Sequence, residues 1–350
     1  MANFVLRFNF CAMADLLQEY LRLLEPSPQL IADMQKLDGD ILILGAGGKM
    51  GPALSKLAMD ALRRSGAKRR IIAVSRFSEE GLQRELNEIG AETIAADLLE
   101  DRDLQSLPEI KNVLYLAGMK FGTSGKESLT WAMNAYLPGR VAEKFKHSNI
   151  VAFSTGNVYP LTPVEAEGAT ELMQPSPIGE YAQSCLGRER IFQYFSSKNN
   201  TPVFIYRLNY ANDIKYGVLV DLAKSVWTGK PIDLSMGHVN IIWQNDANEI
   251  ALRALLHCSV PARVLNITGL KTLSVRSLAE EIGKQMNKKP LFTGKEQPTA
   301  LLSNALESVK YFGAPGTTVE QMIWLISAWV IQDGATINKP THFQERQGQF

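Results

Sequence analysis

The feature that most constrains the fold is a glycine-rich turn directly after a short apolar run. Residues 40–52 have the sequence Asp-Ile-Leu-Ile-Leu-Gly-Ala-Gly-Gly-Lys-Met-Gly-Pro, which places three glycines at intervals of three between a predicted strand and a predicted helix. Glycine allows a tight turn and a close approach of the backbone to a ligand. A helix that begins there offers free N–H groups and a positive dipole end to phosphate. The segment therefore predicts a site for the pyrophosphate of a dinucleotide, with a turn that binds nothing as the alternative. The expected contacts are Gly45, Gly48, Lys49, Met50 and Gly51.

Short apolar runs alternate with longer amphipathic segments as far as Arg207. Strands that are almost continuously apolar, with helices between them, are typical of a parallel sheet covered on both faces. After Arg207, helical segments separated by loops with Pro and Gly indicate a different unit. We predict an α/β fold: a Rossmann-type doubly wound parallel sheet with a smaller, mainly helical C-terminal substrate domain. The predicted strands are 41–44, 71–74, 93–96, 113–117, 150–153 and 203–206.

The same patterns divide the chain into four parts. Some segments of the third part could return to the sheet of the second. The parts are an N-terminal extension with an amphipathic helix (1–39), the NAD(P)-binding Rossmann domain (40–212), the substrate-binding domain (213–335) and a tail (336–350).

Composition excludes several classes of partner. Charged residues make up 21% of the sequence, the net charge is +1 and the two signs are interspersed, so we expect neither nucleic acid nor an anionic membrane as a partner. The longest apolar run, Met322 to Ile331, is about half the length that spans a bilayer. Three widely spaced cysteines and four histidines show no metal-ligand spacing, so no metal site is predicted.

A small-molecule substrate and a reducing, cytoplasmic setting are expected. Residues 1–12 could be a targeting segment, a disordered extension or a product of start-site choice before Met13.

The end of the second predicted strand bears on the choice of cofactor. It is followed by Ser75 and Arg76, with no acid beside them. An acid there would bind the ribose 2′-hydroxyl of NAD, whereas an arginine can pair with the 2′-phosphate of NADP. The pair therefore favours NADP and leaves NAD open.

Several motifs occur in the order found in one enzyme family. Between residues 40 and 329 the chain resembles an extended short-chain dehydrogenase/reductase of the NAD-dependent epimerase/dehydratase family. The resemblance implies that Asp97 and Leu98 hold the adenine edge, although Asp97 could equally cap the next helix, and that Ala117 and Gly118 lie beside the cofactor. It also implies a homodimer through the helices bearing Asn134 and Tyr181. The motifs are Gly45-x-x-Gly48-x-x-Gly51, Asp97-Leu98, Asn134, Phe153 to Tyr159, Tyr181 with Ser184, Arg207-Leu208, Asp246-Ala247 and Leu265 to Gly269.

The resemblance implies a catalytic set with one departure. Tyr181 matches the acid/base, Thr155, 26 residues earlier, matches its hydrogen-bonding partner, and Asn134 joins them. The family pattern is Tyr-x-x-x-Lys, in which the lysine also binds the nicotinamide ribose, but Cys185 stands at that position. Lowering the pKa of a phenol from about 10 to about 7 takes roughly 4 kcal/mol, and a cysteine supplies no positive charge.

Either another cation assists Tyr181, or the activity is slower or needs higher pH. Lys120 and Arg188 are the candidate cations, although each could be an ordinary surface side chain. Cys185 could be a nucleophile, but a small packing residue is the ordinary interpretation. Tyr194 with Lys198 also spells Tyr-x-x-x-Lys, which we attribute to chance.

The motif around Thr155 narrows the chemistry. Dehydratases of the family follow this threonine with Asp-Glu, whereas here Gly156 and Asn157 follow, so dehydration is disfavoured. The prediction is an NAD(P)-dependent epimerase or oxidoreductase acting on a sugar or sugar-nucleotide-like substrate by hydride transfer. The alternative is a dinucleotide-binding protein with little or no turnover, acting as a sensor or assembly partner. Further candidates for the substrate pocket are Asn209, Tyr210, Tyr216, His238, Asn240 and Trp243.

Overall fold

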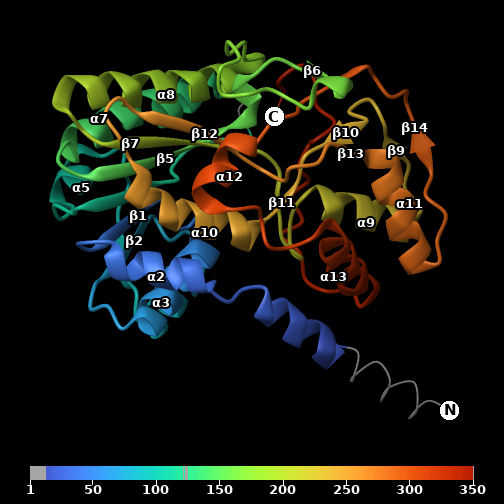
Figure 1. Ribbon diagram of the computed structural model, residues 1–350, viewed down its shortest axis with the longest axis horizontal. Helices are drawn as coiled ribbons and strands as arrows, with labels where there is room; N and C mark the ends of the chain where they lie inside the picture. Colours follow the sequence, from blue (N-terminus) through green and yellow to red (C-terminus); the bar gives the residue numbers. More distant parts are fainter. Residues whose placement is uncertain (1–12, 121, 123–124, 350) are drawn as a thin grey trace.

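The computed structural model describes residues 13–120, 122 and 125–349, and its centre is a seven-stranded parallel sheet (Figure 1). The strand order is β12-β7-β5-β4-β1-β2-β3, so the chain runs outward from β1 in one direction, returns, and continues in the other. This order confirms the predicted doubly wound α/β fold. The strands are β1 (Ile41–Leu44), β2 (Ile71–Ser75), β3 (Glu92–Ala95), β4 (Asn112–Tyr115), β5 (Asn149–Thr155), β7 (Val203–Leu208) and β12 (Arg263–Ile267).

Alternate residues of the central strands point into two different cores. Ile41 and Ile43 of β1 belong to the core on one face, whereas Leu42 and Leu44 belong to the core on the other, and all four are fully buried. This is why the strands have apolar residues at every position rather than at every second one. Helices α2 (Pro28–Lys36), α3 (Gly51–Ser65), α4 (Leu82–Glu88), α10 (Gln244–Ala254) and α12 (Leu306–Phe312) contribute to the first core; α5 (Asp101–Ser106), α7 (Leu137–Lys144) and α8 (Gly179–Asn199) contribute to the second.

Part of the segment after residue 212 completes the sheet. Strand β12 pairs with β7, so that Val264 lies beside Ile205, and α10 packs on α3. The fourth strand ends at Tyr115 rather than at residue 117, although the N–H of Leu116 still donates to the carbonyl oxygen of Leu44 at the end of β1.

A third core, mainly helical, lies beside the carboxyl end of the sheet. Helices α9 (Val218–Thr228), α11 (Val275–Met286) and α13 (Val319–Ile331) pack on one another around the fully buried Trp243. Short strand pairs complete it, such as β9 (Ile232–Asp233) with β14 (Phe292–Thr293) and β10 (His238–Val239) with β13 (Leu273–Ser274).

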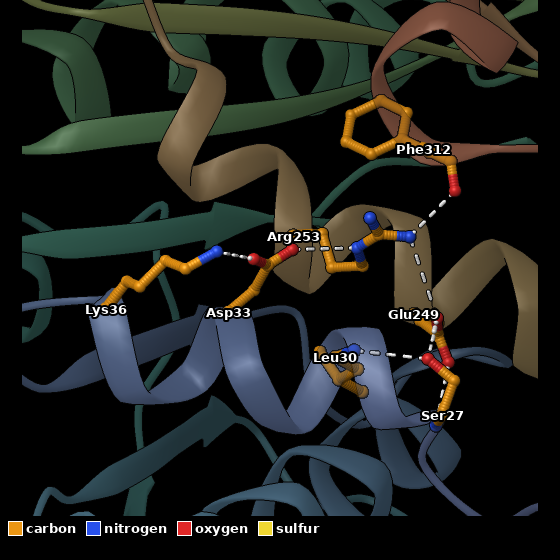
Figure 2. Close-up of polar contacts among 7 residues, drawn as sticks. All are labelled: Ser27, Leu30, Asp33, Lys36, Glu249, Arg253 and Phe312. Atoms are coloured by element: carbon orange, nitrogen blue, oxygen red, sulfur yellow. Dashed lines mark hydrogen bonds and ion pairs between the residues drawn. The ribbon is translucent and has the colours of Figure 1, made fainter.

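Polar contacts fix the extension before β1 to this body (Figure 2). Asp33 of α2 accepts a hydrogen bond from Arg253 of α10 at 2.9 Å, and Ser27, which caps α2, donates to Glu249 at 2.5 Å. Arg253 also donates to the carbonyl oxygen of Phe312, so that one guanidinium joins three helices. Further upstream, Leu16 is buried in the helical core that contains Trp243.

No helix in the described part of the chain is long and apolar enough to cross a membrane.

A buried ion pair joins helix α8 to the sheet. Arg207 of β7 contacts both carboxylate oxygens of Glu189, at 2.9 and 2.6 Å, and both side chains are almost fully buried. Ser154 of β5 donates to the same carboxylate, and Arg207 donates to the hydroxyl of Tyr159. Two-point contact between planar groups fixes geometry as well as charge. The pair therefore sets the position of α8 relative to β5 and β7.

We expect Glu189→Gln to lower the free energy of unfolding by about 3–5 kcal/mol, because it leaves the buried Arg207 charge without its counter-ion. The matched control is Glu296→Gln, which breaks the partly exposed pair with Arg276 and is expected to cost less than about 1 kcal/mol. Urea unfolding of both variants measures the difference. Similar small losses in the two would show that the buried pair does not hold α8 in place.

Candidate active site

The glycine-rich turn lies at the carboxyl end of β1, against the end of β4. Gly45 has φ +90°, and a Cβ at this position would lie 2.7 Å from the backbone nitrogen of Ala117, so only glycine fits. Helix α3 begins at Gly51 with Pro52 in its first turn, and Met50 at its N-cap makes no side-chain cap. The N–H of Gly51 donates to the carbonyl oxygen of Gly48 and Pro52 has no N–H, so the first N–H of α3 that can meet an anion belongs to Ala53.

A pocket of about 380 Å³ opens between this turn and the ends of β4, β5 and β7. It brings together residues that are far apart in the sequence, as expected for the carboxyl edge of an open α/β sheet. Of the predicted site residues, its lining contains Gly45, Gly48, Lys49, Met50, Gly51, Gly118, Lys120, Thr155 and Tyr181.

Tyr181 and Thr155 share a hydrogen bond in this pocket. The Thr155 oxygen also accepts two hydrogen bonds from Asn157, one from the backbone N–H at 3.2 Å and one from the side-chain amide at 2.9 Å. A hydroxyl has two lone pairs and one hydrogen. With both lone pairs engaged, Thr155 is left to donate its hydrogen toward the Tyr181 oxygen, which favours the phenolate.

Burial still dominates the ionisation of Tyr181. Desolvation raises its pKa well above the ordinary value, and Cys185 adds to this rise. The positive charge of Arg188 and the hydrogen bond with Thr155 act in the opposite direction. The ring of Tyr181 also lies 5.7 Å from the ammonium group of Lys120.

Arg188 is a buried cation beneath the pocket. Its guanidinium donates to the carbonyl oxygen of Phe153 at 2.8 Å and to the side-chain oxygen of Asn134 at 2.7 Å. No carboxylate among the described residues forms an ion pair with it, because the neighbouring Glu189 is paired with Arg207. The cation therefore acts on its surroundings without a counter-ion.

Asn134 joins this cation to the loop after β4. It lies in a π-helix, η1 (Ala132–Tyr136), and is fully buried. Its amide exchanges two hydrogen bonds of 2.8 Å with the backbone of Met119 and donates to Ser184 at 3.0 Å. Asn134 thus positions the loop bearing Gly118 and Lys120 and does not line the pocket itself.

Cys185 lies behind Tyr181 rather than in the pocket lining. It is fully buried in a small cluster with Val158, Tyr159 and Ala169. Burial raises the pKa of its thiol, so it stays protonated at neutral pH. The position favours packing over nucleophilic chemistry.

The side of the turn expected to face adenosine holds Ser75, Arg76 and Asp97. Arg76 and Asp97 form an exposed ion pair at 3.8 Å. Asp97 also accepts a hydrogen bond from the N–H of Leu99 and so stabilises the turn before α5. Leu98 and Ala117 are buried in the core, where only their backbone groups could meet a ligand.

Two lysines in the pocket have lowered pKa values. Burial lowers the pKa of Lys49 to about 7, with help from Lys120 and Lys339, and its ammonium group lies 3.6 Å from the ring centre of Tyr216. Burial lowers the pKa of Lys120 to about 8.

Sequence reasoning found only part of the lining after Arg207. Asn209, Tyr210 and Tyr216 line the pocket, whereas Trp243 is a core residue of the helical part and Asn240 bonds to the backbone of Ser303. His238 lies outside this lining as well. The orienting role of Asn157 had a local signal, since a side chain two residues after a threonine can bond back to it. No local sequence signal marked the lining residues Gln244 and Thr341.

The described residues contain no group of three or more His, Cys, Asp or Glu that could hold a metal ion.

The sheet order and the turn define an α/β protein of the Rossmann type. Residues 41–211 match the model of the NAD-dependent epimerase/dehydratase family, in agreement with the resemblance that the motifs of this segment predicted. Among curated proteins, none matches the sequence.

Solved structures share the fold. UDP-glucuronic acid 4-epimerase from Bacillus cereus with NAD is 18% identical, with a TM-score of 0.70 over 84% of this chain and 97% of that one. UDP-Glc/GlcNAc 4-epimerase from Campylobacter jejuni is 17% identical, with a TM-score of 0.69 over 85% and 99%. A short-chain dehydrogenase/reductase superfamily protein from Agrobacterium tumefaciens with bound NAD is 16% identical, with a TM-score of 0.69 over 84% and 97%. At these identities the likeness establishes the fold.

We expect Gly118→Ala to displace Arg188, because the added Cβ would lie 2.4 Å from a guanidinium nitrogen and 2.9 Å from the Asn134 oxygen. Overpacking of this kind costs about 1–3 kcal/mol. Gly187→Ala is the control, since its Cβ would make ordinary contacts of 3.4 Å or more within a helix. Thermal unfolding compares the two, and an unchanged stability of Gly118→Ala would mean that Arg188 is not held against this turn.

Proposed function

We propose that this chain is an NAD(P)-dependent epimerase or oxidoreductase that transfers hydride to and from a carbon of a sugar-like substrate. Tyr181 is the acid/base and Thr155 orients the reacting oxygen. The observation that carries the proposal is the shared pocket: the hydrogen-bonded pair and the glycine-rich turn line the same 380 Å³ space. A nicotinamide dinucleotide held by the turn would supply the hydride acceptor.

The proton step follows from the contacts of Tyr181. As hydride leaves the substrate carbon, the substrate hydroxyl gives its proton to the phenolate oxygen, and the reverse transfer accompanies reduction. Thr155 favours the phenolate because Asn157 occupies its lone pairs. Arg188 supplies fixed positive charge from the same helix, one turn beyond Cys185. We therefore assign the charge of the missing lysine to Arg188, while Lys120 lies 5.7 Å from the ring centre of Tyr181.

The neighbours support a sugar as the substrate class, since the printed names of two of them specify UDP-linked sugars. For the cofactor we propose a preference for NADP. Arg76 is exposed at the end of β2 and bonded only weakly to Asp97, so its guanidinium can turn to a 2′-phosphate.

We also propose a homodimer formed by α6 (Glu127–Trp131), η1, α7 and α8. These helices carry exposed apolar side chains, including Leu129, Trp131, Tyr136 and Tyr194. A run of exposed apolar groups of this kind is typical of an interface.

Replacing Tyr181 by Phe tests the proposed acid/base. We expect kcat to fall by about 10²-fold or more, because general acid–base catalysis contributes 10²–10⁴-fold, with little change in dinucleotide affinity. The measurement is nicotinamide absorbance in the presence of a panel of sugars and sugar nucleotides. Tyr194→Phe is the control, since Tyr194 is exposed on the far part of the same helix. Turnover left unchanged by Tyr181→Phe would overturn the proposal.

Replacing Arg188 by Met tests the fixed charge. Among the groups facing Tyr181, namely Lys120, Cys185, Thr155 and Arg188, only Arg188 and Thr155 lower its pKa. Loss of the cation raises the pKa of Tyr181, so the acidic limb of the kcat/KM profile for oxidation should move to higher pH. Arg188→Lys, which keeps the charge, should move it less. A profile that is scaled down but not displaced would assign Arg188 a purely structural role.

The cofactor preference is tested by Arg76→Ala. We expect the affinity for NADP to fall by about tenfold, the value of a charge-assisted contact, while the affinity for NAD is unchanged. Calorimetric titration with each dinucleotide measures both. Arg84→Ala, which removes an exposed arginine of α4 paired with Glu88, controls for surface charge. Equal losses for the two dinucleotides would contradict a 2′-phosphate contact.

A further inference from the structure

Residues 341–348, the closing segment, reach the catalytic pocket through Thr341. Thr341 lines the pocket and is held to α9 by two hydrogen bonds to Asp221, from its N–H at 2.8 Å and its hydroxyl at 2.6 Å. Phe343 is buried in the helical core, and its carbonyl oxygen accepts a hydrogen bond from Tyr210, another lining residue. The segment therefore begins at the pocket and continues into the helical core beside Tyr210.

The far end of the closing segment is fixed to the helical part and to the start of α8. Arg346 donates to the carbonyl oxygens of Ser235 at 3.0 Å and Thr299 at 2.8 Å, and to the Thr299 hydroxyl at 2.7 Å. Gly348 lies against the start of α8, where a Cβ on Gly179 would come within 2.4 Å of its carbonyl oxygen. The contact is two residues from Tyr181. The segment thus spans from the helical part to the catalytic helix.

The space that remains is small. Pockets for drug-sized ligands measure about 300–1,000 Å³, and this one, at about 380 Å³, must also hold the nicotinamide end of the cofactor. A larger pocket of about 1010 Å³ meets it at Gly48, Lys49 and Tyr216 but runs along α3 toward Leu24, and Tyr181 is not among its lining residues. The room beside Tyr181 suits a single sugar ring.

The charged side chains that line the pocket are all positive. Lys49 and Lys120 line the pocket, and none of its described lining residues is an aspartate or glutamate. Lys49 belongs to the turn that we assign to the cofactor phosphates, whereas Lys120 lies beside the Tyr181 ring, at the reacting end. An anionic group on the substrate would meet Lys120 there.

We propose that the substrate is a compact sugar acid, carrying a carboxylate and no nucleotide, enclosed between Lys120 and the closing segment. The inference rests on the proposed function and narrows its substrate class. The closing segment excludes a nucleotide substituent, and Lys120 selects the carboxylate.

Equilibrium binding tests this without turnover. The protein saturated with NADPH, which cannot accept hydride from a sugar alcohol group, is titrated calorimetrically with glucuronate and galacturonate, with the neutral glucose and galactose, and with UDP-glucuronate. We expect the free acids to bind at least tenfold more tightly than the neutral sugars, the value of one charge-assisted contact, and more tightly than UDP-glucuronate. Lys120→Met should remove the preference for acids over neutral sugars.

The role of the closing segment is tested by Arg346→Ala. This variant releases the segment from Ser235 and Thr299 and should raise the affinity for UDP-glucuronate toward that of the free acid. Arg276→Ala removes an exposed arginine paired with Glu296; it is the control and should change neither the affinity for UDP-glucuronate nor that for glucuronate. Wild-type protein that binds UDP-glucuronate more tightly than glucuronate, or neutral sugars as tightly as acids, would overturn the inference. Those results would contradict the substrate class but not hydride transfer with Tyr181 as acid/base. Conversely, tight binding of free acids without any turnover would contradict only the proposed reaction.

Discussion

The ion pair between Glu189 and Arg207 is the contact on which the site depends. Glu189 lies two turns beyond Tyr181 on α8, and its partner lies on β7, so the pair fixes α8 against the sheet. Ser154, bonded to the same carboxylate, immediately precedes Thr155. Tyr159 extends the network to Asn266 of β12. A single buried charge pair thus fixes the positions of Tyr181, Thr155 and the edge strand β12 relative to one another.

Within this frame, the hydrogen-bond donors around Tyr181 have fixed directions. Asn157 orients the hydroxyl of Thr155, and Phe153 and Asn134 hold the guanidinium of Arg188. Fixed donors and charges stabilise a developing anion without reorganising during the reaction. In the proposed mechanism, Arg188 beneath the pocket therefore supplies the positive charge that Cys185 cannot supply.

The doubly wound parallel sheet and the glycine-rich turn could be predicted from the sequence. Both depend on local patterns, namely continuous apolar strands and glycines at a strand end. The sequence allowed segments after residue 212 to return to the sheet but did not identify β12 as the one that does, since a short apolar run has the same appearance in either unit. Nor did it reveal the contacts of Asn157 or Thr341. Those depend on side-chain directions and on a segment some 160 residues after Tyr181, which no local pattern encodes.

The close passage of Arg188 past Gly118 also constrains how such a chain can evolve. A guanidinium at this place leaves no room for a side chain on the turn after β4, so the two positions form a linked pair. A lineage that regained a lysine on α8 could lose the arginine, and only then could residue 118 grow. Among related chains, a larger residue at position 118 should accompany a smaller one at position 188, and this co-variation would record where the positive charge has moved.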